Sequence, residues 1–104
     1  MALIHFNEST FDEALNSKEL MMVDFWATWC GPCKMLGPVI EQLAEEYEDI
    51  TIGKVDVDEC PALAQRYGIM SVPTVLFFKN GEEIERKIGA MPPMAYSDIL
   101  DENK

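Results

Sequence analysis

The stretch MVDFWATWCGPCKMLGP, residues 22–38, joins an apolar run to two cysteines separated by Gly-Pro. Residues 21–27 are continuously apolar except for Asp24, a pattern typical of a strand covered on both faces in a parallel sheet. Beyond the cysteines, apolar residues recur with helical spacing from Leu36 to Tyr47, and glutamates occupy the other side. The stretch therefore predicts a buried strand, a turn that carries two thiols, and an amphipathic helix.

Length and composition limit the classes of protein to which the chain can belong. Its 104 residues, 48% of them hydrophobic, suit one compact domain, which we assign to residues 1–104. Three cysteines are too few for a secreted disulfide framework, and no segment has signal-peptide or membrane-spanning character. We expect a soluble, cytoplasmic monomer without membrane contact. The formal net charge of -11 disfavours binding to nucleic acid.

Strand and helix patterns alternate along the rest of the chain. Strands are predicted at residues 4–6, 21–27, 51–57, 74–79 and 83–88, and helices follow Thr10, Cys30, Cys60 and Pro93. Thr10 with Glu13 resembles a capping box, and Gly68 is a candidate left-handed helix cap. Asn80-Gly81 is a two-residue hairpin turn signal. The order predicts an α/β fold, with a single-domain mixed sheet of about five strands flanked by four helices.

The two cysteines at the start of the second helix carry the chemistry. Cys30 and Cys33 are three residues apart on one helix face, with Cβ atoms roughly 5–6 Å apart, close to disulfide geometry. At the N-cap, Cys30 faces unpaired backbone N–H groups, which favour its thiolate by up to about 2 kcal/mol. Pro32 suits a first helical turn, and Gly31 leaves room for another chain. Cys30 is the expected nucleophile.

Asp24 is the unusual charge in the buried strand. Burial should raise the pKa of its carboxyl group, which makes it a plausible proton acceptor for the deeper thiol of Cys33. Lys54, on the next predicted strand, is the available counter-charge. The alternative is a structural carboxylate that accepts hydrogen bonds from the backbone.

At this point the residues resemble a known family. The segments VDFWATWCGPCKMLGP, GKVDVDE and YGIMSVPTVLFFKNGE, with Gly89 and Ala90, are similar to the thioredoxin family across nearly the whole chain. The resemblance implies the thioredoxin fold, Cys30 as attacking and Cys33 as resolving cysteine, and Asp24 with Lys54 as buried acid/base and partner. It also implies that Trp26 packs beneath the site.

The resemblance further implies a groove that binds an extended segment of the substrate. Sequence statistics alone would make the Val72–Pro73 bond trans, whereas the resemblance implies a cis bond that lies against the cysteines. The groove residues would be Trp29, Met70, Ser71, Val72, Pro73, Gly89, Ala90 and Met91. Many relatives have a basic residue and glycine at the positions of Met70 and Ser71, so this chain differs where partners are chosen.

The expected function is general protein thiol–disulfide exchange, with reduction of disulfides in target proteins and re-reduction by a separate thioredoxin reductase. No Gly-rich dinucleotide fingerprint is present, so we expect no cofactor. One alternative is a thioredoxin-fold binding subunit. Another is a zinc-binding module built from Cys30, Cys33, Cys60 and His5, although we expect no metal. Cys60 is otherwise a small apolar residue at a helix start, and His5 a packed strand residue.

Overall fold

The computed structural model describes residues 3–104, and its secondary structure alternates as the sequence predicts. In this range the strands are β1 (Ile4–His5), β2 (Met21–Trp26), β3 (Thr51–Asp56), β4 (Thr74–Lys79) and β5 (Glu82–Ile88). The helices are α1 (Glu8–Asn16), α2 (Gly31–Glu46), α3 (Pro61–Arg66) and α4 (Pro93–Asn103). None of the helices in residues 3–104 is long and apolar enough to cross a membrane.

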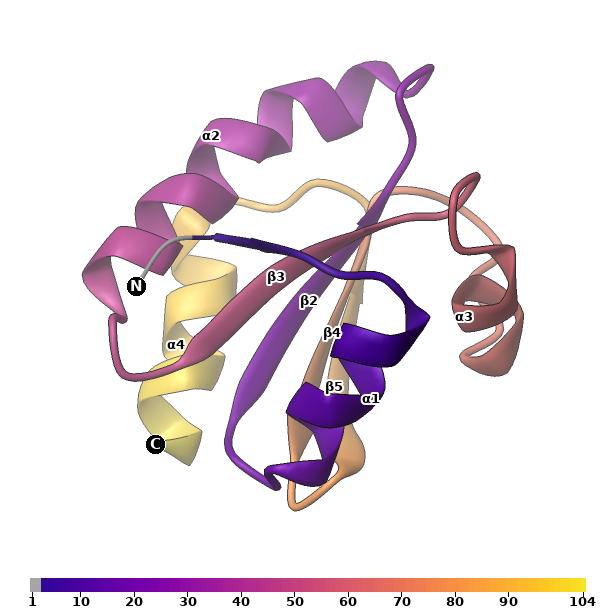
Figure 1. Cartoon of the computed structure of the whole chain (residues 1–104). Coiled ribbons are helices and arrows are strands. Elements are labelled where there is room, and N and C mark those ends of the chain that lie inside the picture. The colour runs from indigo at the N-terminus through magenta and orange to yellow at the C-terminus, as the bar shows by residue number, and fades with distance from the viewer. Residues whose placement is uncertain (1–2) are drawn as a thin grey trace.

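The strands form one sheet in the order β1-β3-β2-β4-β5. β3 pairs in parallel with both β1 and β2, whereas β4 pairs antiparallel with β2 and with β5. The central strand is therefore β2, the apolar strand that carries Asp24 and leads into the cysteines (Figure 1). This arrangement confirms the predicted mixed sheet with helices around it.

Helices cover both faces of the sheet, and Figure 1 shows α2 and α4 on one side and α1 and α3 on the other. Alternate residues of β2 point to opposite faces, because side chains of a strand repeat every two residues. Met22 packs in the apolar cluster under α2 and α4, and Val23 packs in the cluster under α1 and α3. Asp24 therefore points to the α2/α4 side. This placement puts its carboxyl group beneath the helix that begins at the cysteines.

Several local predictions are confirmed. Gly68 has a φ of 60° after α3, and the Ile69 N–H donates to the Ala64 carbonyl at 2.9 Å, which together close the helix end. Asn80 and Gly81 have φ values of 57° and 79°, so the β4–β5 hairpin turns through two left-handed residues. The second helix, α2, continues through Pro38, which lies inside it.

Two local predictions are wrong. The capping box of α1 is made by Asn7 and Thr10, not by Thr10 and Glu13, because the helix starts three residues earlier than expected. Threonine takes the place that glutamate usually holds in such a box. His5 is exposed instead of packed, because β1 has only two residues and lies at the edge of the sheet.

Candidate active site

The cysteines lie at the N-terminus of α2, close enough together to form the expected disulfide. Cys30 is the N-cap residue, and its Sγ accepts the Cys33 backbone N–H at 3.1 Å. Pro32 lies in the first turn, where its missing N–H leaves no helical hydrogen bond unmade. Cys30 and Cys33 form a disulfide, with their Cα atoms 5.3 Å apart. The helix therefore holds both sulfurs on one face and directs the Cys33 N–H at the sulfur of Cys30.

Both cysteines are largely covered, and the coverage is unequal. Cys30 is 5% exposed and Cys33 is 2% exposed, so Cys33 is the deeper of the two by a small margin. They form a small apolar cluster with Ala27, against which the half-buried Trp26 packs. Trp26 thus contacts the cluster that contains both cysteines. The side of Cys30 is therefore the more exposed side of the disulfide.

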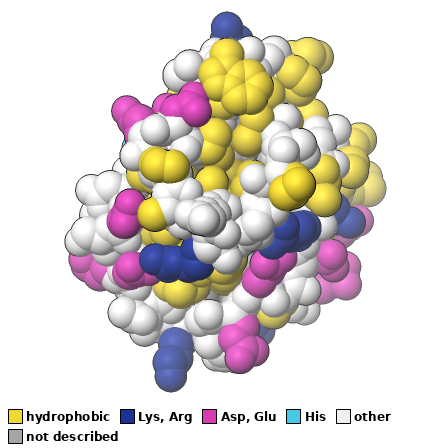
Figure 2. All heavy atoms as spheres, turned by 90° about the vertical axis from the view of Figure 1, so that its right-hand side faces the viewer, with side chains coloured by type: hydrophobic (Ala, Val, Ile, Leu, Met, Phe, Trp, Pro, Cys, Tyr) yellow, Lys and Arg dark blue, Asp and Glu magenta, His cyan; other side chains and the backbone are white. Residues whose placement is uncertain are grey.

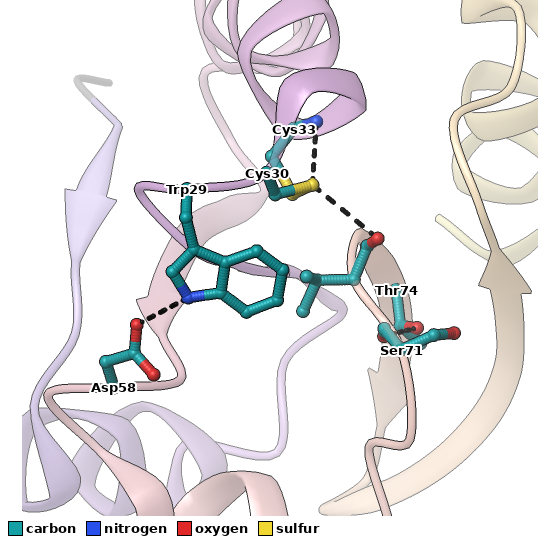
Figure 3. The surroundings of a disulfide bond; sticks show 7 residues. Trp29, Cys30, Cys33, Asp58, Ser71 and Thr74 are labelled. Atoms are coloured by element: carbon teal, nitrogen blue, oxygen red, sulfur yellow. Dashed lines mark hydrogen bonds between the residues drawn. A yellow bond between two sulfur atoms is a disulfide. The ribbon is translucent and has the colours of Figure 1, made fainter.

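The loop before β4 lies against that side. The Val72–Pro73 peptide bond is cis, and Pro73 is buried. The Val72 carbonyl oxygen lies 3.6 Å from the Sγ of Cys30 (Figure 3). In the oxidised protein the Cys30 sulfur carries no proton, so it only contacts the Val72 oxygen. In the reduced protein the Cys30 S–H can donate a hydrogen bond to that oxygen. The loop is therefore in place to direct a bound segment toward the first sulfur.

A shallow hollow opens beside the disulfide. Its volume is about 120 Å³, and its lining residues are Trp29, Val57, Ile69, Met70, Ser71 and Val72. Trp29 is 69% exposed and Met70 is 95% exposed, which is unusual for side chains of this size. Figure 2 shows the side of the molecule on which α3 lies, where apolar side chains gather in a band bordered by charged ones. The hollow and the band can cover apolar side chains of a partner.

Asp58 is a site residue that the sequence analysis did not single out. Its Oδ2 accepts the indole N–H of Trp29 at 2.9 Å, and the two side chains face each other in Figure 3. The sequence signal for Asp58 was an acidic residue two positions beyond the end of β3, at the edge of the sheet where the cysteine turn lies. The hydrogen bond holds an exposed indole in one orientation at the rim of the hollow.

The segment Gly89–Met91 is hydrogen-bonded to the loop that carries Pro73. The Gly89 N–H donates to the Pro73 carbonyl at 2.8 Å, and the φ of Gly89 is 86°. Ala90 and Met91 are exposed. These three residues do not line the hollow beside Trp29. We refer to them together as the 89–91 wall. The groove residues named from the sequence thus fall into two sets, one that lines the hollow and one that is hydrogen-bonded to Pro73.

Asp24 is completely buried at the centre of the sheet. Within residues 3–104 neither of its carboxyl oxygens has a hydrogen-bond partner, which contradicts the alternative of a carboxylate held by backbone N–H groups. Burial raises the pKa of Asp24 to about 7, and the charge of Lys54 opposes that rise. The carboxyl group can therefore gain or lose a proton near neutral pH.

Lys54 lies opposite Asp24 in the parallel ladder between β2 and β3. Its Nζ lies 4.3 Å from the centre of the Trp26 ring, a distance typical of a cation–π contact. The ammonium group thus packs on the tryptophan that contacts the cluster of both cysteines. From there it lowers the pKa of Asp24 by its charge.

The zinc alternative finds no support in the placement of its residues. Among residues 3–104, no three His, Cys, Asp or Glu side chains come together as a metal-binding group. Cys60 belongs to the apolar cluster under α1 and α3, and its Sγ lies 3.8 Å from the Phe6 carbonyl oxygen. Burial raises the pKa of this thiol. Cys60 is thus a packed residue, while His5 is exposed on β1.

Comparison with known proteins gives a consistent result. The Thioredoxin family model matches residues 2–102. The thioredoxin of Staphylococcus haemolyticus (strain JCSC1435) is 44% identical over 104 residues, covering 99% of each chain. Thioredoxin M-type, chloroplastic, of Spinacia oleracea is 50% identical over 97 residues, covering 91% of this chain and 54% of that protein. A solved mutant thioredoxin from Halobacterium salinarum NRC-1 has a TM-score of 0.91 at 37% identity, covering 98% of this chain and 90% of that chain.

Fold, sequence and site chemistry agree over almost the whole chain. The five-stranded mixed sheet with four helices is the thioredoxin fold. Cys30 and Cys33 are joined at the start of α2, and a C-x-x-C pair in this position is the working centre of a thiol–disulfide oxidoreductase. On this evidence the chain belongs to the thioredoxin family.

Proposed function

We propose that this protein reduces disulfides in other proteins through Cys30 and Cys33, and that a separate thioredoxin reductase restores its dithiol. The observation that carries the proposal is the position of Cys30. Its Sγ accepts an N–H at the helix start and lies 3.6 Å from the Val72 carbonyl, beside a hollow that can receive a partner. A thiolate favoured in this way attacks disulfides near neutral pH.

The first step is an exchange between one thiolate and one disulfide. The Sγ of Cys30 attacks a sulfur of the target, the target's S–S bond breaks, and the other target sulfur leaves as a thiolate. A mixed disulfide then joins Cys30 to the target. The backbone beside Val72 can pair with an extended target segment while its apolar side chains lie on Trp29 and Met70.

The second step needs the thiolate of Cys33. Asp24, with a pKa of about 7, accepts the thiol proton either directly or through a water molecule, and Lys54 keeps part of the carboxyl population ionised. The Cys33 thiolate attacks the Sγ of Cys30, the mixed disulfide breaks, and the target leaves with both of its sulfurs reduced. Two electrons have moved from the protein to the target. Because this attack is intramolecular, it proceeds at a high effective concentration.

The oxidised pair must then be reduced again. The Gly-rich dinucleotide fingerprint is absent from the sequence, so the proposal assigns nicotinamide and flavin chemistry to the reductase. A monomer suffices for this cycle. The cytoplasm, where thiols are kept reduced, is the compartment that suits the proposed direction of electron flow.

Single cysteine variants test the assignment of roles. We expect Cys30→Ser to abolish reduction of a disulfide-bonded protein such as insulin, with dithiothreitol as the electron source. Cys33→Ser, reduced beforehand and freed of dithiothreitol, should stop after the first step and accumulate a covalent complex with the target. Mass spectrometry of that complex would locate the link at Cys30.

Cys60→Ser is the matched control, because this thiol is buried away from the disulfide in the other apolar cluster. It should keep full activity. Retained activity of Cys30→Ser, or a covalent complex formed through Cys60, would contradict the proposal.

A further inference from the structure

The 89–91 wall is held to the protein by few hydrogen bonds. Within residues 3–104, its own N–H groups make two: Gly89 donates to the Pro73 carbonyl at 2.8 Å, and Met91 donates to the Tyr96 hydroxyl at 3.0 Å. The next two residues are Pro92 and Pro93, which have no N–H. The second attachment of the wall is therefore a single side chain.

Tyr96 reaches the wall from the first turns of α4. With Pro92 as N-cap, Met91 is the residue before the cap and Tyr96 is the fourth residue of the helix. These are the two positions that an apolar staple joins at many helix starts. In this protein a hydrogen bond joins these two positions, because the Tyr96 hydroxyl accepts the Met91 backbone N–H. Since the side chain of Pro92 makes no capping hydrogen bond, Tyr96 fixes the direction in which the chain enters the helix.

The phenol is held firmly in place. Tyr96 is completely buried, and its ring stacks on Phe77 at a centroid distance of 6.5 Å and an interplanar angle of 25°. Burial raises the pKa of Tyr96, so its hydroxyl stays protonated at neutral pH. A neutral hydroxyl in a fixed position is a suitable acceptor for the Met91 N–H.

We propose that Tyr96 is a positioning residue for target binding: its hydroxyl fixes the 89–91 wall at Met91 and so keeps the groove beside Pro73 in the form that a protein target binds. This inference rests on the proposed function. Tyr96 touches neither sulfur, so its effect on target affinity passes through Met91. The hydroxyl of one buried side chain thereby contributes to target affinity.

The test is Tyr96→Phe, which keeps the aromatic ring on Phe77 and removes the acceptor. For reduction of insulin we expect KM to rise about fivefold, the effect of losing one hydrogen bond, with kcat changed less than about twofold. Reaction with a small aromatic disulfide should be unchanged, because such a molecule needs only the sulfur. Amide hydrogen exchange at Met91 should become faster while exchange at Cys33 stays as before.

Tyr47→Phe is the matched control. The hydroxyl of Tyr47 donates to Asp101 at 2.8 Å at the far end of α2, so the variant loses one tyrosine hydrogen bond without touching the wall. The KM of Tyr47→Phe should equal that of the original protein. This should hold even if Tyr47→Phe and Tyr96→Phe lower the unfolding free energy equally. An unchanged KM for Tyr96→Phe, or an equal rise for Tyr47→Phe, would overturn the inference. Failure of the original protein to reduce insulin would instead overturn the proposed function, and exchange at Met91 would still show whether Tyr96 holds the wall.

Discussion

Asp24 and Lys54 lie opposite one another on neighbouring parallel strands, yet the Nζ of Lys54 packs 4.3 Å from the centre of the Trp26 ring. The carboxyl group of Asp24 has no hydrogen-bond partner in the described part of the chain. A buried ion pair with good hydrogen bonds would have kept Asp24 ionised. The observed arrangement leaves its pKa at about 7, where the carboxyl group can exchange a proton.

The first prediction concerns stability and pH. The pKa of Asp24 is raised from 3.8 to about 7 in the folded protein, so the folded state binds this proton more tightly than the unfolded chain does. The resulting stabilisation is complete below about pH 4 and is lost as the pH rises to about 7. At about 1.36 kcal/mol per pKa unit, the loss is at most about 4 kcal/mol.

Asp24→Asn should remove this loss. In urea unfolding we expect the variant to be more stable than the original protein by a few kcal/mol at pH 8.5, and the advantage to shrink strongly at pH 5. Asp98→Asn, which removes an exposed carboxylate on α4, controls for the change in net charge. An advantage of Asp24→Asn that is equal at the two pH values would contradict the assigned pKa.

The second prediction concerns Lys54, whose positive charge lowers the pKa of Asp24. Lys54→Met keeps an unbranched apolar side chain on Trp26 and removes that charge, so the pKa of Asp24 should rise. The pH–rate profile for resolution of the mixed disulfide should then move to higher pH, with slower resolution at pH 7 and recovery above it. Stopped-flow release of target thiol measures the profile. Lys104→Met, at an exposed lysine on the last turn, should leave the profile in place.

The third prediction concerns the hydrogen bond between Trp29 and Asp58. Asp58→Ala removes the acceptor of the indole N–H and should leave Trp29 free to change its orientation. We expect faster hydrogen exchange of that indole N–H in NMR spectra and a KM for insulin about threefold higher. Glu59→Ala removes a neighbouring exposed carboxylate and should change neither quantity. Equal effects of both variants would show that charge, and not the hydrogen bond, matters here.

The fourth prediction compares two glycines that both have free space where a Cβ would lie. Gly68 has a φ of 60°, so Gly68→Ala forces a side chain into the left-handed region and should cost about 1–2 kcal/mol of unfolding free energy. Gly37 lies inside α2 without a positive φ, and Gly37→Ala should add about 1 kcal/mol. Denaturant unfolding of both variants measures these free energies. The same sign of change in both would contradict the role assigned to the φ of Gly68.

Features that depend on a few neighbouring residues could be predicted from the sequence. Three examples are the N-cap position of Cys30, the helix cap at Gly68 and the turn at Asn80-Gly81. Each depends on the backbone conformations and polar groups that the residues of one short segment favour. The length of α2 follows from its apolar spacing. The capping box of α1 was also local, but Thr10 in place of glutamate concealed it.

The sequence by itself determined the strand–turn–helix unit and its two cysteines, because the information lies within the segment. Only the tertiary structure decided that Asp24 has no hydrogen-bond partner in the described residues, that Asp58 holds Trp29, and that Tyr96 holds Met91. The first and second of these depend on residues that are far apart in the chain and are brought together by the packing of β2, β3 and α2. The third joins two residues only five positions apart, but the burial of the Tyr96 ring against Phe77 in the core holds its hydroxyl there. Burial and contact of this kind are properties of the assembled layers, and no short segment contains them.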